Sequence, residues 1–166
     1  MKNINIFFEK KPLKMICLGF SSGLPILLVF STLSVWLVKA GISRSTVTLF
    51  SWAGFAYAFK YLWSPLVDNY KLPIFKNFGH RRSWLLFSQF LIIIALILTA
   101  FTDPKESLFF TALFITILAF FSATQDILID AFRIESAPQS LQGPLSSMYI
   151  AGYRIAGLAS EPAPAP

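Results

Sequence analysis

Three charged residues of an otherwise apolar segment have a spacing that could support chemistry. Asp126, Asp130 and Arg133 occupy positions i, i+4 and i+7, so a helix would present all three on one face. Two carboxylates one turn apart repel each other unless a cation or a proton lies between them. Arg133 can supply that cation, as can Arg81 and Arg82 from the preceding charged segment. Two interpretations follow: an ion-pair network that holds this helix to the preceding loop, or a site that exchanges a substrate or a proton.

Two further cations interrupt apolar stretches, where a charge is costly and indicates function. Lys60 lies among the aromatic residues of 59–63, so it either faces a substrate path or extends its side chain to the lipid headgroups. Arg154 closes the segment 149–154, which contains two tyrosines and a glycine. That setting suits an anionic ligand in a water-filled cavity, and the alternative is an ion pair with an acidic residue on a neighbouring helix.

The elements that would position these charges are long apolar helices. Charged residues make up only 13 % of the chain, against about 25 % in a soluble domain. Residues 83–102 and 107–125 contain no charge over 20 and 19 positions. At about 1.5 Å of rise per residue, each stretch can cross a hydrocarbon layer of roughly 30 Å. The sequence therefore predicts an all-α, polytopic transmembrane helix bundle.

The sequence predicts one transmembrane domain over residues 1–160, followed by a Pro/Ala-rich tail at 161–166. The expected helices lie at about 13–38, 46–67, 83–101, 107–133 and 144–160. Pro25 lacks a backbone N–H, so it should bend the first helix and free a carbonyl group. The alternating Pro and Ala of the tail cannot continue the fifth helix, which predicts that the chain is truncated.

Basic residues predict how the chain crosses the membrane. Eight Lys and Arg residues lie in the N-terminal segment and in the loop between the second and third helices, against three in the two opposite loops. This asymmetry predicts a multi-pass protein with a cytoplasmic N-terminus. Because the net charge of +6 is dispersed over these short segments, no nucleic-acid partner is expected.

The residue inventory also argues against catalysis. With a single histidine, His80, and a single cysteine, Cys17, we expect no metal site and no cofactor. Asp126 and Asp130 could hold Mg²⁺ in a lipid-headgroup transferase, but the denser aspartates and the adjacent glycine of such a site are not in the sequence. Nucleotide-binding glycine loops are also not found, so an ATP-driven pump is not supported. The sequence predicts a protein that is not an enzyme.

Four segments carry recognisable motifs. The most specific is Phe121-Ser-Ala-Thr-Gln-Asp-Ile-Leu-Ile-Asp-Ala-Phe-Arg-Ile-Glu135. The others are 19–25, 60–68 with 81–84, and 148–154. In this order they resemble the fourth, first, second-to-third and fifth helices of the AmpG-type muropeptide permeases of the major facilitator superfamily. The resemblance implies part of the N-terminal half of a fold with twelve helices in two halves.

The resemblance also implies a function. Members of this family carry anhydromuropeptides, the products of peptidoglycan turnover, across the bacterial inner membrane by proton-coupled symport. The implied substrate and proton site consists of Lys60, Asp126, Asp130, Arg133 and Arg154. The implied gating loop contains Asp68, Arg81 and Arg82, although a longer insert separates Asp68 from the arginines and His80 replaces a basic residue.

The implied partners are membrane lipid, the anhydromuropeptide substrate, protons, and a second half or another copy of the chain. A membrane remnant that does not transport, or a small helical subunit that binds a partner, is the alternative function.

Overall fold

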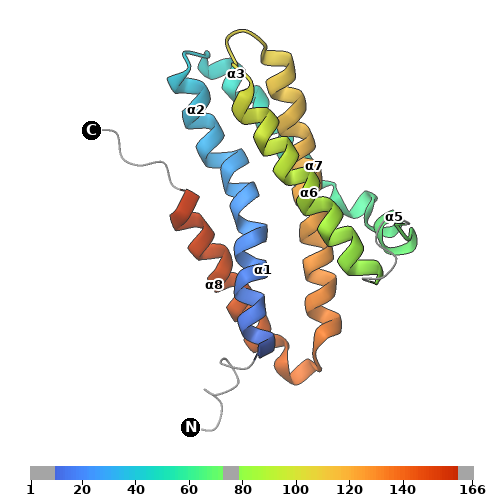
Figure 1. Ribbon diagram of the computed structural model, residues 1–166. Helices are drawn as coiled ribbons and strands as arrows, with labels where there is room; N and C mark the ends of the chain where they lie inside the picture. The colour runs from blue at the N-terminus through green and yellow to red at the C-terminus, as the bar shows by residue number, and fades with distance from the viewer. Residues whose placement is uncertain (1–9, 73–78, 161–166) are drawn as a thin grey trace.

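The long helices of the protein lie side by side, and the helix at Leu108–Ser136 runs in the direction opposite to the others (Figure 1). The computed structural model describes residues 10–72 and 79–160, and the regular secondary structure within these ranges is entirely helical. Three helices are long and apolar enough to cross a membrane: Lys11–Lys39, His80–Phe101 and Leu108–Ser136. The prediction of an all-α transmembrane bundle is therefore confirmed. The predicted tail at 161–166 lies outside the described residues.

The first long helix is interrupted by a wider turn after its proline. It consists of α1 (Lys10–Leu27), a π-helical turn (Leu28–Thr32) and α2 (Leu33–Lys39). Pro25 lies inside α1 and cannot donate a hydrogen bond to the carbonyl oxygen of Ser21, four residues earlier. Nε2 of Gln125 donates to that oxygen instead, at 2.9 Å. A buried side chain of another helix thus satisfies the backbone group that the proline leaves free.

This arrangement predicts a coupling between two residues that do not bond to each other. Replacing Gln125 by leucine should destabilise the bundle by about 2 kcal/mol, because the Ser21 carbonyl is left without a partner in an apolar interior. In a Pro25→Ala background the alanine N–H can bond to the same carbonyl, so the loss should fall by half or more. Unfolding of the three variants and the unmodified chain in mixed detergent micelles measures the coupling, and equal losses in both backgrounds would contradict it.

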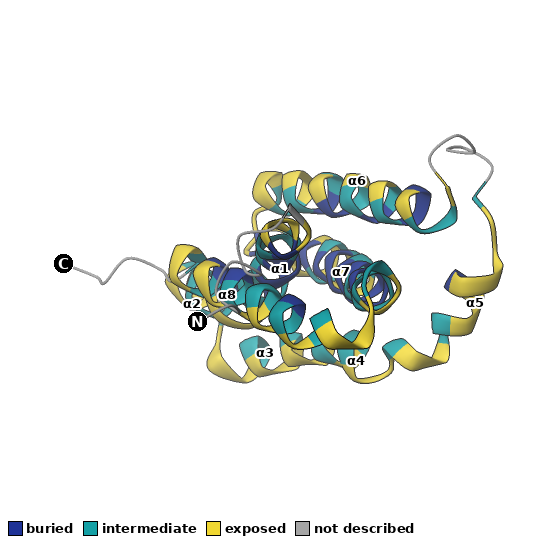
Figure 2. Ribbon diagram, turned by 90° about the horizontal axis from the view of Figure 1, so that it is seen from below, coloured by how far each residue is buried: buried dark blue, intermediate teal, exposed yellow. Residues whose placement is uncertain are grey.

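The predicted helix at 46–67 is wrong as a single element. The chain instead forms α3 (Arg44–Leu49), a 3₁₀ turn (Phe50–Ala53), α4 (Gly54–Ala58), η4 (Lys60–Leu62, also 3₁₀) and α5 (Ser64–Asn69). Pro65 accounts for the break before α5, because it lies in the first turn of that helix and has no N–H to donate to the carbonyl oxygen of Tyr61, four residues earlier. Figure 2 shows this segment as an arc along one side of the bundle, with much of its surface exposed.

The remaining helices are α6 (His80–Phe101), α7 (Leu108–Ser136) and α8 (Gln142–Ser160), with a 3₁₀ turn (Gln139–Leu141) before α8. The apolar stretch of α7 is 56 % buried, against 22 % for that of α6, which identifies α7 as the centre of the bundle. The main hydrophobic core lies between α7, α6, the second half of the first long helix and the 3₁₀ turn at Phe50–Ala53: Val29, Leu33, Leu37, Ala53, Ile92, Ala95, Ile115, Leu118 and Ala119.

Helices α1 and α8 approach each other more closely than side chains would allow. A Cβ atom at Gly19 would overlap the backbone carbonyl of Tyr149, and one at Gly152 would overlap that of Ile16. In lipid, where little hydrophobic force drives helices together, such close backbone packing is a main source of association. The contact places the polar residues of α8 directly against α1 and α7.

Candidate functional site

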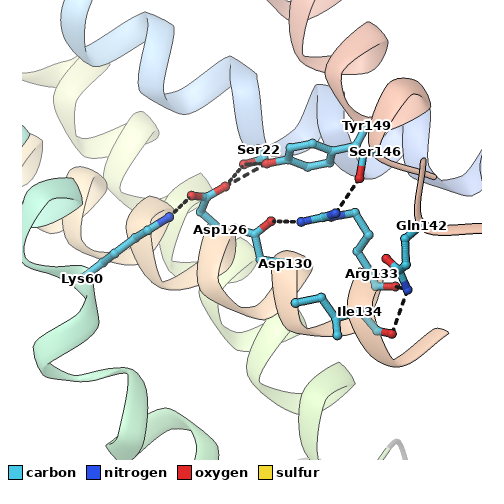
Figure 3. Close-up of polar contacts among 9 residues, drawn as sticks. All are labelled: Ser22, Lys60, Asp126, Asp130, Arg133, Ile134, Gln142, Ser146 and Tyr149. Atoms are coloured by element: carbon cyan, nitrogen blue, oxygen red, sulfur yellow. Dashed lines mark hydrogen bonds and ion pairs between the residues drawn. The ribbon is translucent and has the colours of Figure 1, made fainter. Parts of the chain in front are cut away.

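Asp126 lies at a junction of four elements in the interior of the bundle (Figure 3). Its carboxylate accepts hydrogen bonds from Oγ of Ser22 and from the hydroxyl of Tyr149, both at 2.8 Å, and it forms an ion pair with Lys60. These partners come from α1, α8 and η4, whereas Asp126 itself belongs to α7. We call Asp126, Lys60, Ser22 and Tyr149 the central cluster.

The central cluster is electrically balanced and largely shielded. The side chains of Lys60 and Asp126 are only 14 % and 20 % exposed. A carboxylate has no proton to donate, so three donors around it favour its ionised form, and the ammonium supplies the opposite charge. Lys60 therefore points into the bundle toward Asp126, not outward to lipid headgroups. The pair can break only if another group, or a proton, replaces one of its members.

The lower part of the same α7 face holds a second charged pair. Asp130 accepts from Nη2 of Arg133 at 3.2 Å, and Nη1 of Arg133 donates to Oγ of Ser146 on α8 at 2.6 Å. Gln142 adds a bond from its amide to the carbonyl oxygen of Ala137, at 2.8 Å. Figure 3 shows Asp126, Asp130 and Arg133 on the same side of α7, as their spacing predicted.

The cations that neutralise the two aspartates of α7 differ from those expected from the sequence. The spacing had offered Arg133, Arg81 or Arg82 as the cation between the two aspartates. In the structure Asp126 pairs with Lys60, and Asp130 pairs with Arg133. Asp126 and Lys60 are 66 positions apart, and this distance hid their pairing from an analysis of local spacing. Both charges interrupt apolar stretches, however, and opposite charges in lipid must find each other, which is the signal that could have predicted this pair.

Arg81 forms a separate clamp at the end of the bundle where α6 begins. Its Nη1 donates to Asp68 of α5 at 3.0 Å, and its Nε and Nη2 donate to the two oxygens of Glu135 on α7, at 2.6 and 2.5 Å. Arg81 therefore does hold α7 to the preceding charged segment, but through Glu135, which the sequence analysis did not select. Glu135 ends the most specific of the four motifs, so its place there was the available signal.

The Arg81 clamp should make a small, salt-sensitive contribution to stability, because its acidic partners are 43 % and 58 % exposed. Replacing Arg81 by glutamine is expected to cost about 1 kcal/mol at low ionic strength and less in high salt. Arg44→Gln, which removes an exposed cation at the opposite end of the bundle, is the matched control. Unfolding measured at two salt concentrations tests this, and a loss that is independent of salt would argue against an electrostatic clamp.

Two of the predicted site residues are not brought into these groups. Arg154 and Arg82 are exposed, and within residues 10–72 and 79–160 neither forms a hydrogen bond or an ion pair. Conversely, Ser22 and Tyr149 contact Asp126 although the sequence analysis did not choose them. Both lie in motif segments, 19–25 and 148–154, so their positions were marked but their roles were not. In the described part of the chain, no group of three His, Cys, Asp or Glu side chains could hold a metal ion.

Comparison with known proteins identifies the family of the chain. The family described as "Acetyl-coenzyme A transporter 1" matches residues 13–150. A transporter named AmpG 4 from Rickettsia felis is 43 % identical over 152 residues, which cover 90 % of this chain and 36 % of the relative. The anhydromuropeptide permease of Escherichia coli K12 is 38 % identical over 157 residues, which cover 95 % of this chain and 31 % of the relative.

The chain thus spans about a third of the length of these curated relatives. The resemblance to AmpG-type permeases that the four motifs predicted is confirmed, since relatives bearing that name match nearly the whole chain. The family match covers most of the chain as well. This protein therefore belongs to the family of membrane transporters described as acetyl-coenzyme A transporter 1.

Proposed function

We propose that this chain contributes the N-terminal part of a proton-coupled permease that carries anhydromuropeptides across the bacterial inner membrane. The name of the Escherichia coli relative supports the substrate. The excess of Lys and Arg in the N-terminal segment and near the start of α6 supports a cytoplasmic N-terminus. A second half of the transporter, or another copy of the chain, would complete the substrate path.

The observation that carries this proposal is the ion pair between Lys60 and Asp126. A balanced pair in an apolar bundle costs more than apolar packing, so its retention favours a role beyond stability. When Asp126 takes up a proton, it loses the charge that holds Lys60. The released ammonium can then bind an anionic group of the substrate, such as a peptide carboxylate. Loss of the proton restores the original pair and expels the anion.

The other charged residues have supporting roles in this proposal. Arg154 is exposed on α8, so its guanidinium can bind a second carboxylate of the substrate. The pair of Asp130 and Arg133 can exchange partners in the same way as the central cluster, at the end of α7. Asp68, Arg81 and Arg82 are the proposed gating residues, and the Arg81 clamp, which includes Asp68, has to open when the halves move.

Uptake into a permease-deficient strain of Escherichia coli tests the proposal. The cells express a chimera in which this chain replaces the matching segment of the E. coli permease, and labelled anhydromuropeptide is supplied with and without a protonophore. We expect uptake that requires the proton gradient. Cells expressing this chain alone, with its membrane level checked, show whether it transports without the remaining helices or acts only as a helical subunit or remnant.

Two results would contradict the proposal. The family description names acetyl-coenzyme A, so labelled acetyl-coenzyme A is the competing substrate. Uptake of acetyl-coenzyme A without uptake of the muropeptide would show that the proposed substrate is wrong. Muropeptide uptake that persists after the gradient collapses would show that protons do not drive it. An unmodified E. coli permease in the same strain provides the reference rate.

A further inference from the structure

A cavity unrelated to the central cluster opens between α1, α6 and α7, three helices that lie next to one another in Figure 2. Its volume is about 500 Å³, and it lies at the end of the bundle where α6 begins. The wall is apolar over most of its area, with cations at one end. Its lining includes Leu18, Leu85, Leu86, Leu128 and Phe132, together with Lys14, Arg81 and Arg82.

Two of the three cations at this cavity have no hydrogen-bond or ion-pair partner among the residues that the structure describes. Arg81 is committed to Asp68 and Glu135 through the clamp described above. Lys14 and Arg82 are exposed, and within the described ranges 10–72 and 79–160 no ion pair or hydrogen bond engages either of them. Two unpaired positive charges at the mouth of an apolar cavity are complementary to an anion that carries a hydrocarbon chain.

The length of the cavity indicates whether its occupant is a lipid or a further transmembrane helix. Nε2 of Gln89 on α6 lies 3.3 Å from Oγ of Ser21 on α1, and this bridge separates the cavity from a smaller one of about 290 Å³ farther along the same helices. Lys14 and Ser21 are seven positions apart, which is about 10 Å along the helix axis. A transmembrane helix needs a continuous groove of roughly 30 Å.

We propose that this cavity is a binding site for an anionic phospholipid. The phosphate lies between Lys14 and Arg82, and the first part of one acyl chain lies against Leu18, Leu85 and Phe132. The rest of the lipid extends into the bilayer through the open side. Basic pockets between transmembrane helices at the cytoplasmic surface bind anionic lipids in this way. A bound lipid would link α1 to the start of α6, beside the Arg81 clamp.

Native mass spectrometry of the purified full chain in detergent micelles tests the site. Phosphatidylglycerol and phosphatidylethanolamine with the same acyl chains are titrated separately. We expect phosphatidylglycerol to bind with the higher affinity. The double variant Lys14→Gln/Arg82→Gln should lose that affinity by about tenfold or more. Lys39→Gln/Lys105→Gln, which removes two exposed cations at the other end of the bundle, is the matched control and should bind as the unmodified chain does.

A second variant distinguishes a cavity from simple surface attraction. Leu86→Trp fills the apolar part of the cavity without changing any charge, and Leu86 is 40 % exposed, so the fold should tolerate the substitution. Specific binding of phosphatidylglycerol should fall, whereas charge attraction alone would leave it unchanged. The proposal is overturned if the two lipids bind equally, if both double variants lose affinity equally, or if a second copy of the chain occupies the site and excludes lipid.

Discussion

Replacing Asp126 by asparagine is expected to abolish gradient-driven uptake by the chimera and to destabilise the bundle by about 3 kcal/mol. The amide keeps the shape of the carboxylate and can still accept bonds from Ser22 and Tyr149. What it loses is the negative charge, so the ammonium of Lys60 remains unpaired in a largely shielded position. Uptake in the permease-deficient strain and unfolding in mixed micelles measure the two effects.

A second substitution separates the structural effect from the transport effect. In the double variant Asp126→Asn/Lys60→Met both charges are removed, and most of the lost stability should return because no unpaired charge remains. Uptake should stay absent, because neither a proton acceptor nor an anion-binding ammonium is left. If the double variant transports, the pair is only structural.

The control for this series is Asp103→Asn, which makes the same chemical change in an exposed turn between α6 and α7. It should leave uptake within about twofold of the unmodified chimera, since exposed substitutions away from a site have small effects. Retention of normal uptake and pH dependence by Asp126→Asn alone would remove Asp126 from the proposed mechanism.

Replacing Gly152 by alanine is expected to destabilise the bundle by about 3 kcal/mol, although the same change usually stabilises a helix. The added Cβ would overlap the backbone carbonyl of Ile16, which cannot move without shifting α1. Separation of α1 from α8 would also withdraw Tyr149 from Asp126, so uptake should fall together with stability. Unfolding in mixed micelles gives the first effect, and uptake at equal membrane levels gives the second.

Gly157→Ala is the matched control on the same helix. A Cβ at Gly157 would lie 3.6 Å from Cδ1 of Leu27, an ordinary van der Waals distance to a flexible side chain. We expect a gain of about 0.5 kcal/mol from the alanine at this position. Equal effects at Gly152 and Gly157 would show that the close approach of α1 and α8 does not hold the bundle together.

Elements governed by local chemistry could be predicted from the sequence. The charge-free stretches at 83–102 and 107–125 form most of α6 and much of α7, apart from the capping residues Thr102 and Ser107, because a helix is the only open-chain element that satisfies its own backbone in lipid. The common face of Asp126, Asp130 and Arg133 followed from helical periodicity alone. Pro25 predicted a free carbonyl for the same reason, since a proline removes its hydrogen-bond donor wherever it lies.

Elements governed by competition between distant groups could not be predicted from the sequence. The segment 46–67 has enough apolar residues for one long helix. The structure instead has five short helical pieces there, and the segment contains Pro65 and Lys60, which pairs with Asp126. Average hydropathy does not register either effect. The acceptor of Arg81 was also misjudged, because Asp68, Glu135 and the two aspartates of α7 were all available to it, and only their positions in space decide.

The sequence by itself determined the class of protein, the long helices and the family, since each depends on composition, period or short motifs along the chain. The tertiary structure alone decided which cation neutralises which carboxylate, which side chain completes the Ser21 carbonyl, and where α1 and α8 touch. The physical reason is the separation along the chain of the groups that interact. Helix formation and membrane insertion depend on neighbours within a few turns, whereas an ion pair in lipid depends on two groups that the fold brings within hydrogen-bonding distance across 66 positions.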